Sequence, residues 1–136
     1  MTSRREARKI VLQALYAYEM RESRPEELVE EFIRENSLDE KSVAFVKELL
    51  LKVIQNMNYV DDLIKGCVEH WDFSRLAVVD KNILRLSIGE FLFFADIPRK
   101  VSIDEAIELA KEFSSSDSGS FVNGVLDSIA KQLNRD

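Results

Sequence analysis

Apolar residues recur at steps of three and four along nearly the whole chain, which is the spacing of amphipathic α-helices. No stretch alternates apolar and polar residues with the period of two that marks a half-buried strand. The few glycines and prolines, four and two, are typical of long helices joined by short turns. We therefore expect an all-α fold of about seven helices, at residues 3–18, 23–35, 39–57, 58–71, 75–95, 102–113 and 121–133.

Several polar residues predict where these helices begin. Serine followed three residues later by glutamate is typical of a capping box, in which the two side chains accept hydrogen bonds from free backbone N–H groups. We expect capping boxes at Ser3–Glu6, Ser23–Glu26 and Ser102–Glu105, and single caps at Asp39 and Asn58. Asn56 and Asn58 mark a break in the helical pattern near residues 57–59, which divides three helices from four. It predicts one domain of two adjoining small helical bundles, the N-terminal bundle at about 1–57 and the C-terminal bundle at about 58–136.

The charge is unevenly distributed along the 136 residues. The whole chain has a formal net charge of −6, but residues 1–9 carry +3 and residues 19–40 carry −6. A basic pole beside an acidic pole would orient a polyanion on one face of the molecule. The alternative is an ordinary solvated surface of mixed charge, which composition alone does not separate from the first interpretation.

The basic residues of the first helix are the first candidate binding site. Arg4, Arg5, Arg8 and Lys9 lie in its first two turns, mostly off the apolar stripe. Cations at a helix N-terminus oppose the helix dipole, so their placement suggests that an anion is bound there. Arginine binds phosphate with two parallel hydrogen bonds and stacks on unpaired bases. We expect this helix start to bind a ligand that carries phosphates or unpaired bases; the alternative is a solubilising helix end.

The second candidate site is the serine-rich segment 114–120, which precedes the last helix. Hydroxyls and backbone N–H groups at a helix start suit an anion or a base edge, and Asp117 can accept hydrogen bonds from a base. The alternative is a connecting loop.

Weaker candidates are three cations of the long fifth helix, Arg75, Lys81 and Arg85. Tyr16, which lies off the first helix's stripe, can stack on a base or pack on a protein.

Signatures of catalysis are missing from the sequence. There is no glycine-rich phosphate loop, no G-x-S-x-G and no H-E-x-x-H, so we expect no enzyme activity. His70 near Cys67 and Glu69 is more consistent with a structural role than with a metal site. The single cysteine excludes an internal disulfide. The longest apolar run, 91–95, is too short to span a membrane, and no signal peptide is evident, so we expect a cytoplasmic protein.

Specific segments carry a family resemblance. The segments are R-R-E-A-R at 4–8, A-L-Y at 14–16, V-D-K-N-I-L-R at 79–85, I-P at 97–98, V-S-I-D-E-A-I-E-L-A-K-E-F at 101–113 and D-S-G-S-F-V-N-G-V-L-D at 117–127. In this order, and over essentially the whole chain, they resemble the family of the transcription antitermination factor NusB. The chain departs from the family pattern at Ser114, where glycine is usual.

The resemblance implies a fold of two small helical bundles and a function without catalysis or cofactor. Family members bind boxA RNA together with NusE, a ribosomal small-subunit protein, and promote processive transcription of ribosomal RNA operons by acting on RNA polymerase. The implied RNA-binding residues are Arg4, Arg5, Arg8, Lys9, Asp117, Ser118 and Phe121. The implied NusE contacts are Tyr16 and Asp80. Family members also occur as homodimers.

Two other functions stay open on the sequence. The first is a protein–protein adapter that docks its first helix on an acidic partner and has no intrinsic RNA specificity. The second is the helical module of an RNA cytosine methyltransferase, in which a similar domain precedes the catalytic part. Nothing in this chain is suited to hold a methyl donor, so catalysis would require another polypeptide.

Overall fold

The computed structural model describes residues 3–68 and 73–136. Across these residues the chain forms seven α-helices, one short 3-10 turn and no strand, which confirms the predicted all-α fold. The elements are α1 (Arg4–Met20), α2 (Pro25–Glu35), α3 (Glu40–Gln55), α4 (Met57–Cys67), the turn η1 (Phe73–Arg75), α5 (Val78–Phe93), α6 (Arg99–Phe113) and α7 (Ser118–Gln132).

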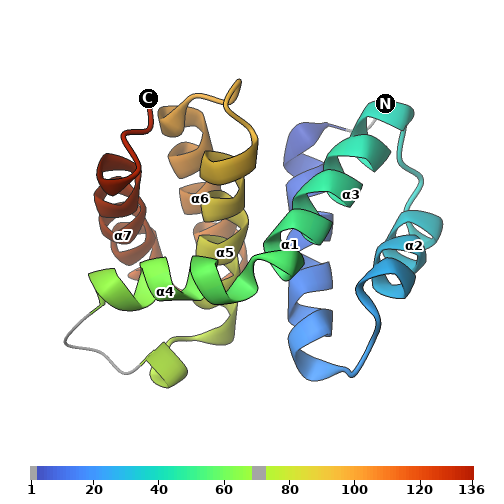
Figure 1. Cartoon of the computed structure of the whole chain (residues 1–136), viewed down its shortest axis with the longest axis horizontal. Coiled ribbons are helices and arrows are strands. Elements are labelled where there is room, and N and C mark those ends of the chain that lie inside the picture. Colours follow the sequence, from blue (N-terminus) through green and yellow to red (C-terminus); the bar gives the residue numbers. More distant parts are fainter. Residues whose placement is uncertain (1–2, 69–72) are drawn as a thin grey trace.

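The helices lie in two groups (Figure 1). Helices α1, α2 and α3 occupy one side of the molecule, and α4, α5, α6 and α7 occupy the other. The chain crosses between them at Asn56, where α3 ends and α4 begins with a change of direction. Helix α5 joins the groups because it packs against α1 and α3 as well as against α6 and α7.

The hydrophobic core runs through both groups without a break. Every helix contributes fully buried apolar side chains to a single cluster, and examples from α1 to α7 are Leu15, Leu28, Leu49, Ile64, Ile83, Ala106 and Leu126. Helix α5 is buried over most of its surface, since apolar side chains from neighbouring helices cover it on several sides. It is therefore the element on which the candidate sites are built.

A close approach of α3 and α5 depends on Gly89. A Cβ atom added at this position would lie 2.5 Å from Cγ2 of Val53 and 2.9 Å from Cδ1 of Leu49. Because Val53 is branched at Cβ and fully buried, it cannot move aside without disturbing its own packing.

Two of the predicted helix starts are confirmed. The Ser3 hydroxyl accepts a hydrogen bond from the N–H of Glu6 (3.1 Å), so α1 begins on a rigid, capped turn. Asp39 caps α3 by accepting from the N–H of Ser42 (2.9 Å). Both caps are local contacts, and the basic residues of α1 are therefore held on an ordered element.

Other predicted boundaries are wrong. Helix α2 begins at Pro25 after Arg24, without a side-chain cap from Ser23. Helix α4 begins at Met57, one residue before the predicted cap at Asn58. Helix α5 begins at Val78 rather than near residue 75, because the 3-10 turn η1 precedes it.

The predicted start of α6 at Ser102 is also wrong. The helix begins at Arg99, directly after Pro98, so Ser102 lies inside its first turns rather than at its cap. The Ser102 side chain is buried, and its hydroxyl donates to Oε1 of Glu90 on α5 (2.8 Å). A capping motif in the sequence therefore serves a contact between helices.

Candidate nucleic-acid interface

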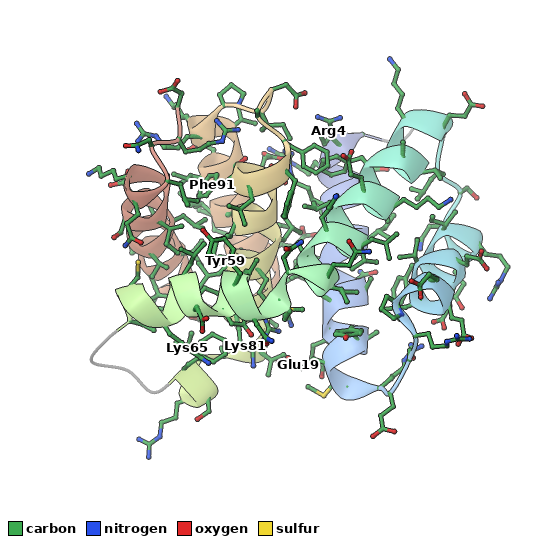
Figure 2. All side chains as sticks on the ribbon, viewed as in Figure 1. Arg4, Glu19, Tyr59, Lys65, Lys81 and Phe91 are labelled. Atoms are coloured by element: carbon green, nitrogen blue, oxygen red, sulfur yellow. The ribbon has the colours of Figure 1, made fainter. Side chains whose placement is uncertain are left out.

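The exposed side chain of Arg4 lies at the N-terminus of α1 beside α3 (Figure 2). Its guanidinium carbon lies 4.4 Å from the centre of the Phe45 ring, close enough for a cation–π interaction. This contact leaves the donors of the guanidinium without a carboxylate partner among the described residues. Arg4 is therefore suited to bind a phosphate from solution.

Arg5 forms a two-bond ion pair with Glu105 on α6. Its Nε and Nη2 donate to the two carboxylate oxygens at 3.0 and 2.6 Å. The hydrogen bond from Arg5 lowers the pKa of Glu105 below its usual value of 4.5, in spite of partial burial, and the charges of Arg5 and Arg8 add to this effect. The same pair raises the pKa of Arg5.

Arg8 is buried, so the prediction that it lies on the polar side of α1 is wrong. Only 4% of its surface is exposed. Its Nε and Nη2 donate to the two carboxylate oxygens of Glu90 at 2.7 and 2.9 Å, and its Nη1 lies 3.4 Å from Glu105. Because Glu90 also accepts from Ser102, this one cluster ties α1, α5 and α6 together.

Lys9 completes the basic group and pairs with Glu112 at the end of α6, with Nζ 3.0 Å from Oε2. Three of the four predicted RNA-binding cations thus contact a glutamate of α5 or α6. The anion that the sequence suggested at this helix end is supplied in part by the protein itself. Sequence analysis missed these glutamates because they lie 82 to 103 residues away and no local pattern marks them.

Asp80 and three serines form a hydrogen-bonded cluster at the start of α7. Oδ1 of Asp80 accepts from the hydroxyl of Ser114 (2.8 Å), and Oδ2 accepts from the hydroxyl of Ser118 (3.0 Å). Ser118 also lies within 3.1 Å of Ser115. Asp80 and Ser118 are only 9% and 5% exposed. The segment is therefore a fixed turn with a buried polar anchor.

Asp117, Ser118 and Phe121 line one surface pocket of about 340 Å³. Asp80 reaches the same pocket from α5, and Arg75 reaches it from η1. The structure therefore brings the three candidate residues of the last helix together. They lie beyond the C-terminal end of α6, whereas Arg5 pairs with Glu105 near the middle of that helix.

The other two cations of the long helix have internal partners. Lys81 lies 2.6 Å from Glu19 (Figure 2), and Arg85 forms two hydrogen bonds with Asp61 at 2.8 and 2.9 Å. Burial lowers the pKa of Arg85. The hydrogen bonds and negative charges of Asp61 and Glu19 raise this pKa by a larger amount, so it lies above its usual value. Burial raises the pKa of Glu19, but Lys81 and Arg85 outweigh this and lower it. These cations hold α1, α4 and α5 together.

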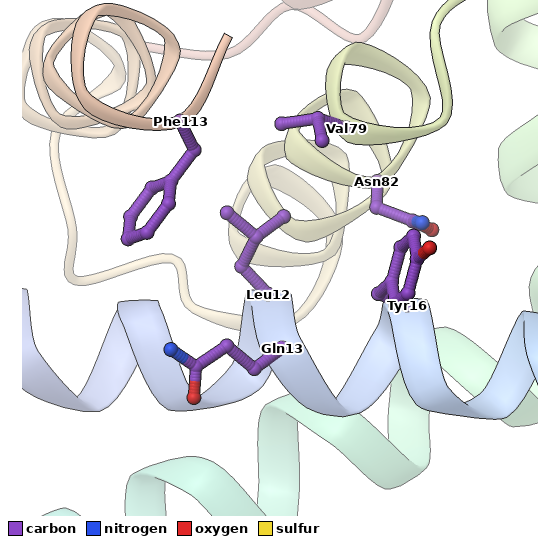
Figure 3. A pocket seen from close by; sticks show the side chains of 6 residues that line it. All are labelled: Leu12, Gln13, Tyr16, Val79, Asn82 and Phe113. Carbon is purple, nitrogen blue, oxygen red and sulfur yellow. The ribbon is translucent and has the colours of Figure 1, made fainter.

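Tyr16 lies on a second, mostly apolar pocket of about 200 Å³ (Figure 3). In this pocket Leu12, Gln13 and Tyr16 of α1 face Val79 and Asn82 of α5 and Phe113 of α6. Tyr16 is 47% exposed, as its position off the apolar stripe predicts. Asp80, the other predicted partner contact, follows Val79 but points into the serine cluster.

The candidate metal ligands named from the sequence are Cys67, Glu69 and His70. Glu69 and His70 lie outside the described residues, and within the described ranges no three His, Cys, Asp or Glu side chains are grouped so that they could hold a metal ion. Cys67 contacts the hydroxyl of Ser128 at 3.5 Å.

Among the described helices, none is long and apolar enough to cross a membrane.

The fold and these surfaces define a small all-helical protein with a polar face across α1, α6 and the start of α7. The sequence model of the NusB family matches residues 5–131. The chain is 41% identical over 132 residues to the transcription antitermination protein NusB of Chloroherpeton thalassium, covering 96% of this chain and 63% of that protein. It is 43% identical over 141 residues to NusB of Geobacter sp. strain M21, covering 98% and 97%. The chain belongs to the NusB family.

Solved structures agree with this assignment. A structure of NusB from T. maritima has a TM-score of 0.90 and 43% sequence identity, covering 96% of this chain and 92% of that one. A structure of antitermination factors NusB and NusE in complex with double-stranded RNA has a TM-score of 0.85 and 28% identity, covering 95% and 96%. The family is one of transcription antitermination proteins and is not a known enzyme family.

Proposed function

We propose that this protein is an RNA-binding transcription antitermination factor that binds boxA RNA together with NusE and supports processive transcription of ribosomal RNA operons. A related NusB has been crystallised with NusE and RNA, which supports both partners for this chain. The proposal places the protein in the cytoplasm, within an RNA polymerase antitermination complex.

The observation that carries this proposal is the continuity of the surface between the two candidate RNA sites. Lys9 of α1 pairs with Glu112 in the last turn of α6, and the next residue, Phe113, faces Gln13 of α1. The serine cluster follows directly and anchors the start of α7. The α1 cations and the pocket at Asp117 therefore lie on either side of Phe113, and a single-stranded RNA that joins them would pass over this exposed aromatic ring.

The residues divide into three roles in this proposal. Arg4, Arg5 and Lys9 contact phosphates, whereas the buried Arg8 holds the helix start in place. Asp117 and Phe121 contact a base, with Ser118 as the anchor of their turn. Tyr16 and its pocket face NusE, and Asp80 acts on that face indirectly by fixing the serine cluster.

Variants test this division of roles in a binding assay with NusE present. Replacing Arg4, Arg5 and Lys9 by alanine should weaken binding of all RNAs similarly, because phosphate contacts carry no sequence information. Asp117→Ala should instead change the preference among RNA sequences. Contact with three or four phosphates of single-stranded RNA predicts a slope of log K against log salt of about −2 to −3. A slope near zero would exclude phosphate contacts as the source of affinity.

The second candidate function is an adapter without intrinsic RNA specificity, and the neutralised cations of α1 favour it. RNA must compete with Glu105 for Arg5, so Glu105→Gln should tighten RNA binding severalfold if the first proposal is right. Glu35→Gln on α2 makes the same change of charge at an exposed site outside the candidate RNA surface. Equal effects of the two variants, or no effect of either, would support the adapter.

A further inference from the structure

A turn outside the segments that the resemblance assigns to RNA contributes a cation to the pocket at the start of α7. Arg75 ends η1, and it lines this pocket together with Asp117, Ser118 and Phe121. The pocket volume of about 340 Å³ falls within the range of small-ligand sites. The site is therefore large enough to take one group of a bound polymer rather than only a water molecule.

Like Arg4, and unlike the remaining cations near the candidate interface, Arg75 has no carboxylate partner among the described residues. Arg5, Arg8 and Lys9 pair with glutamates, and so do Lys81 and Arg85. Arg75 is exposed and has no hydrogen bond or ion pair within the residues that the structure describes. A phosphate can therefore bind Arg75 without breaking an internal ion pair.

The other walls of the pocket suit a nucleobase. Phe121 is half-buried and presents an aromatic ring, on which any base can stack. The exposed Asp117 carboxylate makes no side-chain cap to α7, so it can accept from the amino group of a base. Asp80 has both oxygens occupied by serine hydroxyls and serves as the fixed floor.

We propose that Arg75 binds a phosphate of the nucleotide whose base the proposed function places against Phe121 and Asp117. The inference rests on the proposed function and adds η1 to the RNA path. Two carboxylates beside one arginine would repel a free anion. The pocket therefore selects a nucleotide that brings both a phosphate and hydrogen-bond donors, rather than a phosphate alone.

The test compares Arg75→Ala with Arg34→Ala, which removes an exposed arginine on the far side of the molecule, in α2. Both are measured by fluorescence anisotropy with boxA RNA and NusE over a range of salt concentrations. Arg75→Ala should weaken binding about three- to tenfold and reduce the salt slope by about 0.7, the value for one phosphate of a single strand. Arg75→Lys should restore much of the slope, since it restores the charge.

A second measurement locates the contact on the RNA. Neutral methylphosphonate linkages are placed at one position at a time. At one position the neutral linkage should weaken binding of the wild-type protein. It should leave binding of the Arg75→Ala variant unchanged, because that variant has already lost the phosphate contact. The inference is wrong if Arg75→Ala and Arg34→Ala have the same RNA affinity and the same salt slope. It is also wrong if every neutral linkage weakens binding of the wild-type protein and of Arg75→Ala equally. Failure of the proposed function would look different, since the wild-type protein itself would then show no preference for boxA RNA.

Discussion

The guanidinium of Arg8 and the carboxylate of Glu90 meet in the interior, where each has a two-bond partner. Ser102 supplies a further donor to Glu90, so the buried charges are hydrogen-bonded as well as paired. Removing one member of such a pair leaves the other charge buried without compensation, which is far more costly than losing a surface ion pair. The four cations of the first helix therefore differ in role although they are alike in sequence.

We predict that Arg8→Ala lowers the free energy of unfolding by about 3 kcal/mol or more, because it leaves Glu90 buried and unpaired. Urea denaturation followed by circular dichroism measures this change. Arg4→Ala, at an exposed site of the same helix, is the control and should change stability little. Equal stabilities of the two variants would contradict the structural role of Arg8.

The pair between Arg5 and Glu105 predicts a pH dependence. The pKa of Glu105 is lowered in the folded protein, so its pairing stabilises the fold fully above the usual carboxyl pKa of 4.5. This stabilisation is lost as the pH falls through the lowered pKa. The difference in stability between wild type and Glu105→Gln should therefore be constant near neutral pH and shrink in acid. A difference that persists unchanged in acid would show that Glu105 stabilises without its charge.

Single helices were predictable where their signals are local. The apolar stripes locate the helices, and Ser3 and Asp39 cap them through residues three positions away. The sequence around Ser102 fits the capping-box pattern equally well. Its hydroxyl nevertheless donates to Glu90, and the helix begins earlier, at Arg99. Local patterns cannot reveal such long-range pairing. For the same reason the candidate residues could be named from the sequence, but the burial of Arg8 and Asp80 could not.

Helix α5 is sensitive to any added volume on the face that meets α3. We predict that Gly89→Ala lowers the free energy of unfolding by about 1–3 kcal/mol, because its Cβ would overlap with Val53 and Leu49. Gly124→Ala is the matched control, since a Cβ there meets nothing within 4 Å on the described residues. The control should be neutral or slightly stabilising, as alanine is the better helix former. The close approach of α3 and α5 would be refuted if both variants were equally stable.

For the molecule as a whole, the arrangement of α5 decides how the two groups of helices relate. The core is continuous, and the ion pairs of Arg85 and Lys81 with Glu19 link α5 to α1. We propose that the two predicted bundles, at about 1–57 and 58–136, fold as one cooperative unit. Thermal unfolding should then show one transition by fluorescence and by circular dichroism. Two separated transitions would instead indicate independent bundles.

The central claim is that one face of this molecule binds a specific RNA together with a protein partner. The most direct test is fluorescence anisotropy of a labelled boxA RNA and a scrambled RNA of equal length, with and without NusE, at two salt concentrations. We predict tighter binding of boxA RNA, further strengthening by NusE, and weakening by salt. Equal weak binding of both RNAs, unchanged by NusE, would contradict the account and leave an adapter for other proteins.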